Sequence, residues 1–215
     1  MYLKRQKVPK RWPIPRKGNK YVVRPNFGLN KGVPILIILR DMLKIAQNRK
    51  EVKKALHINH VLLNGKAVKD EKNIAQLFDV ITLSPSGENY QLILTQNGKF
   101  DLEKLNGKEK SQKIIKIIGK KMLKGKKIQL NLNDGINFLS DIKCNVNDSV
   151  IVDLKNNTIK SCISLKEKTN AIALGGKHAG KKGIISKIII DKKMVDLEVD
   201  KKVMKILIKH IMVTE

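Results

Sequence analysis

The hydrophobic positions of this chain change period at several points, and each change predicts an element. Residues 34–46 repeat apolar side chains at helical spacing, behind a proline that suits the first turn of a helix. The apolar positions of this predicted amphipathic helix are Ile35, Ile38, Leu39, Met42 and Ala46. A second short helix is predicted over 49–57, because Asn48 and Glu51 are spaced as an N-cap and its capping partner.

From residue 61 onward, short apolar runs alternate with turn residues, which is typical of strands. Asn64-Gly65 between apolar pairs predicts a β-hairpin over 61–68, and a further strand is predicted over 80–83. Residues 110–123 fit a helix or a strand by period, and their β-branched isoleucines favour a strand. Other strands are predicted at 91–95, 100–105, 128–132, 136–139, 150–154, 159–165, 184–190, 194–199 and 203–213.

The whole pattern indicates an α+β chain that is mostly β, in four regions. An extended arm at 1–33 precedes a helix-helix-hairpin module at 34–84. Short strands divided by turns at 85–170 favour a central domain that resembles a barrel. Residues 171–215 follow as a small β-barrel that begins with a glycine-rich basic loop at 175–183.

The arm is the most unusual region in composition. The first forty residues hold eleven of the 45 Lys and Arg residues, five of the six prolines and no acidic residue, in a chain of net charge +26. A segment that repels itself and has little apolar surface is expected to stay extended until a partner orders it. Cations neutralise phosphates and aromatic rings stack on unpaired bases, so we expect the arm to become ordered on RNA.

Candidate RNA-binding residues follow from charge and aromatic character. All six arginines precede residue 50, and arginine forms forked hydrogen bonds that lysine cannot form. In the arm the candidates are Lys4, Arg5, Lys7, Lys10, Arg11, Trp12, Arg16, Lys17 and Arg24. Nine lysines between 108 and 127 indicate either diffuse phosphate neutralisation or a solvated face.

The loop at 175–183 has the spacing of a nucleotide-binding Walker loop but lacks its chemistry. Lys182 stands where Ser or Thr would hold magnesium, and a strand is predicted to follow where a helix is needed. We interpret the loop as one whose glycines let Lys177, Lys181 and Lys182 approach phosphates, with His178 stacking or donating a hydrogen bond. The alternative is a tight turn with solvated lysines.

No other chemistry is indicated by the sequence. Cys144 and Cys162 lack the spacing of a zinc site, and reduced thiols of a cytosolic protein are expected. No nucleophile motif or catalytic carboxylate pair emerges, so we expect neither enzyme activity, a metal, a cofactor nor a small-molecule substrate. The apolar run 33–39 is too short to cross a bilayer, although the arm could attract anionic lipid.

Taken in order, several segments resemble the S-four-e family of small-subunit ribosomal proteins, which is found in archaea and eukaryotes. The similar segments are 3–5, 9–17, 23–25, 34–41, 49–52, 68–70, 79–81, 87–88, 128–135 and 174–183. The resemblance implies that residues 34–84 form an S-four-type RNA-binding module and that residues 171–215 form a domain of KOW type. Lys181 and Lys182 stand where arginine is common in the family, and the short ends resemble the archaeal form.

The resemblance implies a structural component of the small ribosomal subunit, located in the cytoplasm. Its partners would be small-subunit rRNA and neighbouring ribosomal proteins. It implies that the arm threads into rRNA and that the module docks on RNA through Arg49, Lys50, Lys53, Lys54, Asn64 and Lys66. The KOW-like loop would add a contact through Lys177, His178, Lys181 and Lys182.

Two alternatives compete with a ribosomal role. An enzyme with a similar RNA-binding module would need a catalytic motif, and none is present in the sequence. A non-ribosomal KOW-containing RNA-binding factor, active in transcription elongation or associated with ribosomes, would bind transiently. The long basic arm argues against such a factor, because an arm that is disordered in isolation suits permanent burial in a large RNA.

Overall fold

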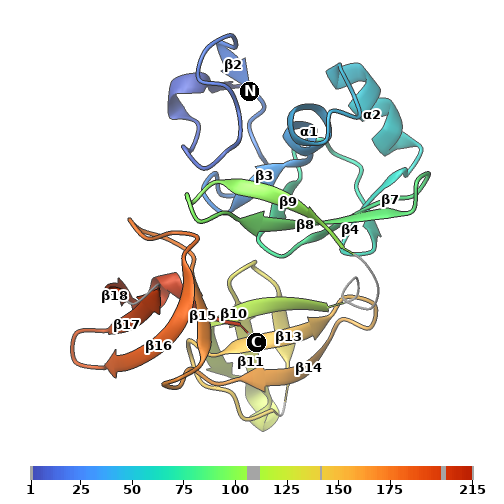
Figure 1. Ribbon diagram of the computed structural model, residues 1–215. Helices are drawn as coiled ribbons and strands as arrows, with labels where there is room; N and C mark the ends of the chain where they lie inside the picture. Colours follow the sequence, from blue (N-terminus) through green and yellow to red (C-terminus); the bar gives the residue numbers. More distant parts are fainter. Residues whose placement is uncertain (1, 106–111, 141, 200–201, 215) are drawn as a thin grey trace. The chain divides into compact units, whose positions relative to one another are not determined.

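The computed structural model describes residues 2–105, 112–140, 142–199 and 202–214 (Figure 1). The chain forms two compact units, one of Met1–Ile93 with Lys99–Ser111 and one of Leu94–Gly98 with Gln112–Glu215. The structure is mostly β with few helices, as the sequence predicts. The units do not divide at residue 85 as expected, because two later strands continue the sheet of the N-terminal unit.

The N-terminal unit is built on a five-stranded sheet in the order β5-β4-β7-β8-β9. Its strands are β4 (Val61–Leu63), β5 (Lys66–Ala67), β7 (Val80–Leu83), β8 (Glu88–Leu94) and β9 (Phe100–Lys104). The predicted hairpin is confirmed: β4 pairs with β5, and Asn64 and Gly65 between them have φ of 51° and 79°. Two positive φ values in a two-residue loop are those of a type I′ turn, which matches the twist of the strands.

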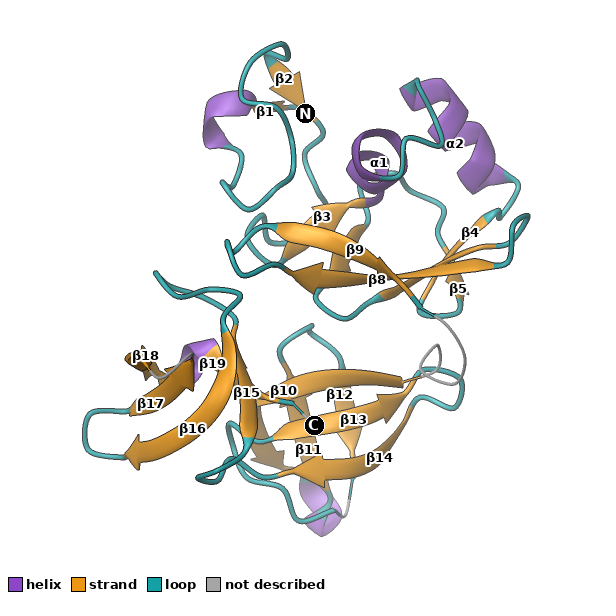
Figure 2. Ribbon diagram, viewed as in Figure 1, coloured by secondary structure: helices purple, strands orange, loops and turns teal. Residues whose placement is uncertain are grey.

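Both helices lie on the same side of this sheet (Figure 2). α2 (Arg49–His57) has the predicted bounds, and the capping box of Asn48 and Glu51 is present. Val52 and Leu56 of this helix are buried, whereas its lysines are exposed. A further pair that the sequence did not predict, β3 (Gly32–Pro34) with β6 (Ile74–Gln76), joins the start of the module to the segment after the hairpin.

The first helix differs from the prediction of a single amphipathic helix over 34–46. Pro34 is extended and belongs to β3, and the helix runs as α1 (Ile35–Ile37) and then as a π-helical segment (Ile38–Met42). It ends early because Lys44 adopts a φ of 56°. Residues 35–39 are all buried, so the first part of this element is apolar on every face rather than on one stripe.

The arm is folded, and the expectation of an extended, unfolded segment is wrong. β1 (Leu3–Lys4) pairs antiparallel with β2 (Tyr21–Val22), and the 3₁₀ turn η1 (Arg5–Lys7) follows β1. The buried apolar residues of the arm are Leu3, Val8, Trp12, Ile14, Val22 and Val33. Its average composition suggests too little apolar surface, but these side chains are buried, although Tyr2, Tyr21 and Phe27 of the arm remain exposed.

The C-terminal unit contains two five-stranded antiparallel sheets. The first, in the order β12-β11-β10-β13-β14, is formed by β10 (Gln112–Met122), β11 (Ile128–Leu132), β12 (Asn137–Leu139), β13 (Ser149–Asp153) and β14 (Thr158–Ile163). The 3₁₀ turn η4 (Lys124–Lys126) links β10 to β11. The choice of a strand for 110–123 is confirmed from residue 112 onward, and its first two residues lie outside the described residues.

The second sheet has the order β18-β17-β16-β15-β19. Its strands are β15 (Asn170–Ala173), β16 (Lys182–Ile189), β17 (Met194–Val199), β18 (Lys202–Leu207) and β19 (Ile211–Val213). The strand predicted over 203–213 is two strands, because the turn η5 (Ile208–His210) sends β19 to pair with β15. Each sheet has its own core of Ile, Leu and Val, with Ile117 and Leu130 in one and Ile185 and Leu197 in the other.

Candidate nucleic-acid interface

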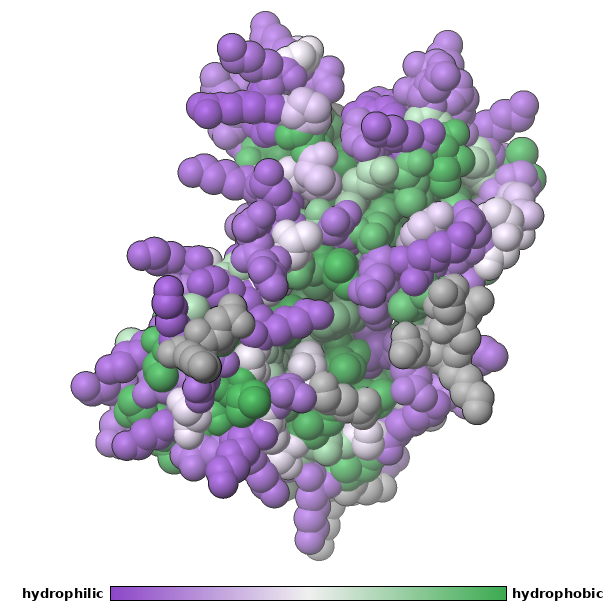
Figure 3. Space-filling view, in the orientation of Figure 1, coloured by the Kyte–Doolittle hydropathy of each residue, from purple (hydrophilic) through white to green (hydrophobic). Residues whose placement is uncertain are grey.

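Basic side chains of the arm lie outside its small apolar core. Hydrophilic side chains project from the arm and from α2 in the space-filling view (Figure 3). The exposed candidates of the arm are Lys4, Lys7, Lys10, Arg16, Lys17 and Arg24. Because the backbone beneath these residues is folded, their charges are displayed on a formed surface rather than on a random chain.

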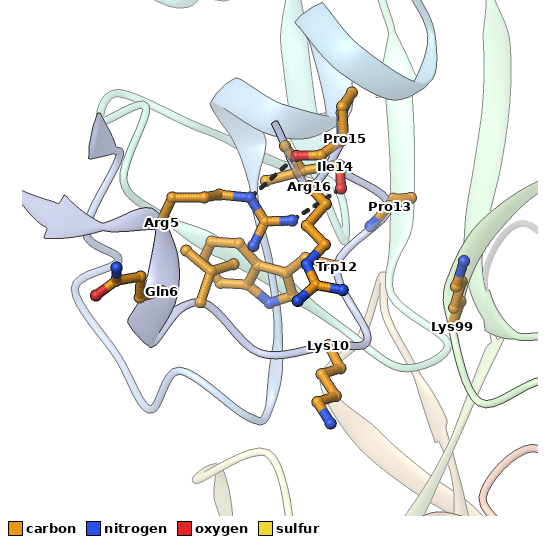
Figure 4. A pocket seen from close by; sticks show the side chains of 10 residues that line it. Arg5, Gln6, Lys10, Trp12, Pro13, Ile14, Pro15, Arg16 and Lys99 are labelled. Carbon is orange, nitrogen blue, oxygen red and sulfur yellow. Dashed lines mark hydrogen bonds between the residues drawn. The ribbon is translucent and has the colours of Figure 1, made fainter. Parts of the chain in front are cut away.

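Two of the predicted arm residues form hydrogen bonds within the arm, and a third is partly buried. Arg5 donates from Nε to the carbonyl oxygen of Pro15 (3.1 Å) and from Nη2 to that of Ile14 (3.0 Å) (Figure 4). Arg11 is half-buried, and burial lowers the pKa of its guanidinium. Trp12 is 2% exposed, and its Nε1 donates to the carbonyl oxygen of Gly32 (2.8 Å). The prediction that Trp12 stacks on RNA bases is therefore wrong, because its ring anchors the arm.

A groove of about 1030 Å³ runs along the arm. Its cationic lining residues are Arg5, Lys10, Arg16 and Lys99, and its apolar lining includes Ile14 and Pro15 (Figure 4). Lys99 was not predicted, and it reaches the arm because the neighbouring Phe100 N–H donates to the carbonyl oxygen of Arg11 (2.9 Å). This contact joins residues far apart in sequence, so no local signal could have revealed Lys99.

The helical module displays a second basic surface. Lys50, Lys53 and Lys54 of α2 and Lys66 of the hairpin are exposed, as predicted. Arg49 is also exposed, but its guanidinium pairs with the buried carboxylate of Glu71. The hydrogen bond to Glu71 raises the pKa of Arg49.

Asn64 is a predicted RNA-binding residue whose side chain is occupied within the protein. Its Nδ2 donates to Asp79 Oδ1 (2.7 Å), and its Oδ1 accepts the N–H of Val80 (2.9 Å). The side chain thereby fastens the hairpin turn to the start of β7. We interpret Asn64 as a structural residue, which corrects the expectation that its side chain contacts RNA.

The loop at 175–183 is basic, but its glycines serve the protein's own packing. An added Cβ at Gly180 would overlap the carbonyl oxygen of Thr95, and one at Gly183 would overlap that of Glu198. At Gly175 it would lie 2.6 Å from His210 Nδ1, whereas Gly176 faces open space. The interpretation that these glycines allow close approach to phosphates is therefore wrong for all but Gly176.

The cations of this loop differ in exposure. Lys177 and Lys182 are exposed, His178 is half-buried, and half-buried Lys181 directs its Nζ to Met204 Sδ (3.6 Å). β16 begins at Lys182, so a strand follows the loop and the rejection of a Walker loop is confirmed. The loop can present two solvated lysines to a polyanion.

The lysine-rich segment from 108 to 127 is not one uniform solvated face. Lys113 is 3% exposed and pairs with Asp134 (2.8 Å). Lys116 is equally buried and donates to the carbonyl oxygens of Ile208 and Ile211. Lys120, Lys121, Lys124 and Lys127 are exposed, and Lys108 and Lys110 lie outside the described residues.

The chain that carries these surfaces is similar to known proteins. The model described as "Ribosomal family S4e" matches residues 86–159, and that of the "RS4NT (NUC023) domain" matches residues 2–28. The small ribosomal subunit protein eS4 of Methanocella arvoryzae is 36% identical over 190 residues, 87% of this chain and 80% of that protein. The chain belongs to the S4e family of ribosomal proteins.

Two further matches agree with membership of the S4e family. The small ribosomal subunit protein eS4 of Nanoarchaeum equitans is 36% identical over 192 residues, 87% of this chain and 82% of that protein. The crystal structure of the 30S ribosomal protein S4e from Thermoplasma acidophilum matches with a TM-score of 0.74 at 27% identity. The match covers 85% of this chain and 94% of that one. The resemblance to the S-four-e family is thus confirmed.

Among the described residues of this S4e chain, no group of three or more His, Cys, Asp and Glu side chains could hold a metal ion. Cys144 and Cys162 form no disulfide, and burial with a hydrogen bond to Cys144 raises the pKa of Cys162 to about 12. No helix among the described residues is both long and apolar enough to cross a membrane.

Proposed function

We propose that this chain is a structural constituent of the small ribosomal subunit that binds rRNA and supports subunit assembly and translation. The observation that carries the proposal is its 36% identity, over 87% of its length, to proteins named small ribosomal subunit protein eS4. The net charge of +26 fits a polyanionic partner. Its further partners would be neighbouring ribosomal proteins, within cytoplasmic ribosomes, and it would act without catalysis.

The RNA contacts would come from the exposed cations of three surfaces. These are Lys4, Lys7, Lys10, Arg16, Lys17 and Arg24 of the arm, Lys50, Lys53, Lys54 and Lys66 of the module, and Lys177 and Lys182 of the loop, which we assign to a KOW-like domain over 171–215. Each phosphate that they neutralise releases counterions, which makes the binding strong at low salt and sensitive to salt. Arg5 and Trp12 would act indirectly, by keeping the arm in the shape that displays its lysines.

The test is sedimentation of a cell extract through a gradient at roughly half-molar salt, a concentration at which proteins held only by nonspecific charge dissociate. We expect one copy of this chain to remain with each small subunit. Release into the free fraction, or retention far below one copy, would contradict a structural role. That outcome would favour a transient KOW-containing RNA-binding factor.

A further inference from the structure

The arm displays two aromatic rings that its apolar core does not use. Tyr2 is 62% exposed and Tyr21 is 46% exposed, whereas Trp12 is buried. Among the described residues, the exposed aromatic side chains are these two tyrosines and Phe27, so all of them lie in the arm. Single exposed apolar side chains are normal on a protein surface, but rings that gather in one place indicate a contact.

The two tyrosine rings touch each other. Their centroids are 4.4 Å apart and their planes meet at 64°, an edge-to-face arrangement that the charge distribution of aromatic rings favours. In such a contact the edge of one ring covers at most one face of the other, so the pair leaves further ring faces unused. The exposed fractions of both side chains agree with this geometry. The pair therefore offers flat apolar surface to another ring.

The backbone fixes the side of the arm on which the rings lie. In the pairing of β1 with β2, Leu3 is opposite Val22, and both are buried. Lys4 is opposite Tyr21, and both are exposed. This is the alternation of side chains that strands produce, and the ring contact places Tyr2 on the same outer side. The rings are thus displayed by a formed pair of strands.

Cations flank the rings, in a segment without acidic residues. Lys20 Nζ lies 5.5 Å from the centroid of the Tyr21 ring. Lys4 projects beside the same ring from the neighbouring strand, because directly opposite residues have side chains on one face of a sheet. Both lysines are exposed, and no Asp or Glu precedes Asp41. The complementary ligand is a flat ring joined to a negative charge, and an unpaired nucleotide has both.

Resting on the proposed function, we propose that an unpaired base of the RNA stacks on the Tyr2–Tyr21 pair and that Lys4 and Lys20 neutralise the adjacent phosphates. Unpaired RNA bases are commonly recognised by stacking on aromatic side chains. Every base has a π-face, so the contact tolerates different sequences. The stacking expected of Trp12 from the sequence is assigned to two smaller rings, because Trp12 anchors the arm.

The experiment compares oligouridine with an abasic oligonucleotide of equal length by fluorescence anisotropy, using the full-length protein. Both probes carry the same phosphates, so the ratio of their affinities isolates the contribution of the bases. The double variant Tyr2→Leu with Tyr21→Leu keeps apolar bulk and removes the rings. It should lower the affinity for oligouridine roughly five- to a hundred-and-fiftyfold, the range for one stacked base, and leave the affinity for the abasic probe unchanged.

Matched controls separate stacking from other causes. Tyr2→Phe with Tyr21→Phe retains both rings and should bind both probes as wild type does. Lys4→Gln should weaken both probes equally and lower the salt slope by about 0.7, as for one lost phosphate contact on a single strand. Shielding of Trp12 from acrylamide in each variant would show that the arm is still folded.

Photocrosslinking tests the same contact in the unaltered protein. A single-stranded RNA that contains iodinated uridine should crosslink wild type at Tyr2 or Tyr21, as located by mass spectrometry. Crosslinks confined to other residues, an unchanged affinity ratio in the leucine variant, or an equal loss in the phenylalanine variant would each overturn the inference. An unchanged ratio would favour a neighbouring ribosomal protein as the partner of the rings. These results leave the ribosomal role intact, because sedimentation with the small subunit tests that role separately.

Discussion

The arm, described from residue 2 to residue 33, and the loop at 175–183 both present lysines to solvent, but different features hold them in place. In the arm, side chains provide the support, because Trp12 is buried against Gly32 and Arg5 binds two backbone carbonyls. In the loop, glycines provide the support, because Gly180 and Gly183 pack directly against other backbone segments. Truncating a buried side chain should therefore destabilise the arm, whereas adding a side chain at a packed glycine should destabilise the loop.

The largest effect is expected at Gly180, where φ is +88° and an added Cβ would overlap the carbonyl oxygen of Thr95. Gly180→Ala should lower the free energy of unfolding by about 5 kcal/mol or prevent folding of the C-terminal unit, because left-handed strain and a backbone clash combine. Gly176→Ala is the matched control, since it has a similar φ of +80° but open space around it. It should cost only about 1–2 kcal/mol in denaturant unfolding. Equal losses for the two variants would contradict the packing role of the loop glycines.

The next largest effect is expected from removing the anchor of the arm. Trp12→Ala should destabilise the N-terminal unit by about 3–5 kcal/mol, the range for truncating a large buried aromatic side chain. Lys10→Ala, an exposed neighbour, should change the free energy of unfolding by less than about 0.5 kcal/mol.

Trp12 also reports directly on whether the arm is folded without RNA, because it is the single tryptophan of the chain. Its fluorescence should be shielded from acrylamide in the purified protein and become accessible only on unfolding. Quenching of the native protein as strong as that of the unfolded one would restore the expectation of a disordered arm and remove the contrast with the loop.

The sequence predicted well those elements whose signals are local. α2, β7, β11 and β17 have the predicted bounds, because a capping box or turn residues mark their ends. The Asn64-Gly65 hairpin is of the same kind. The exposure of the lysines on the arm and α2 also follows from charge alone, since a solvated ammonium group needs no specific neighbour.

What the sequence could not reveal depends on contacts between distant segments. Trp12 meets Gly32, twenty positions away, and the packing of Gly180 depends on Thr95. Glu71 likewise pairs with Arg49, twenty-two positions away in the sequence. A pattern of residue types does not show which distant backbone segments pack against each other. Composition therefore suggested a disordered arm, and the spacing of the loop suggested glycines that approach phosphates.

A further contrast lies within the unit that carries the loop, between its solvated lysines and the buried Lys116. Burial lowers the pKa of Lys116 to about 8, from an ordinary value of 10.5. Below about pH 8 the amine is protonated in both folded and unfolded states, and the cost of burying the charge is fully present. Between about pH 8 and 10.5 the unfolded state binds more protons, so the free energy of unfolding should rise with pH, by on the order of 3 kcal/mol.

Denaturant unfolding at several pH values, with Lys116→Met as the reference, would isolate this contribution. Both proteins gain stability from the general loss of positive charge, so the difference between their pH slopes belongs to Lys116. Parallel slopes would mean that the ammonium group is solvated, in contrast to its donation to the carbonyl oxygens of Ile208 and Ile211.

The smallest effect on the fold is expected from neutralising exposed cations. These substitutions compare how much the arm and the loop each contribute to RNA binding. Replacing Lys4, Lys7, Lys10 and Lys17 by Gln should leave the free energy of unfolding within about 0.5 kcal/mol of wild type, as should Lys177→Gln with Lys182→Gln. If each lysine contacts a phosphate, the salt slope of RNA binding should fall by about 0.7 per contact, so by about 3 for the arm and about 1.4 for the loop. Retention on the small subunit should follow the same order. Equal losses would contradict the arm as the principal anchor, and reversed losses would favour the loop.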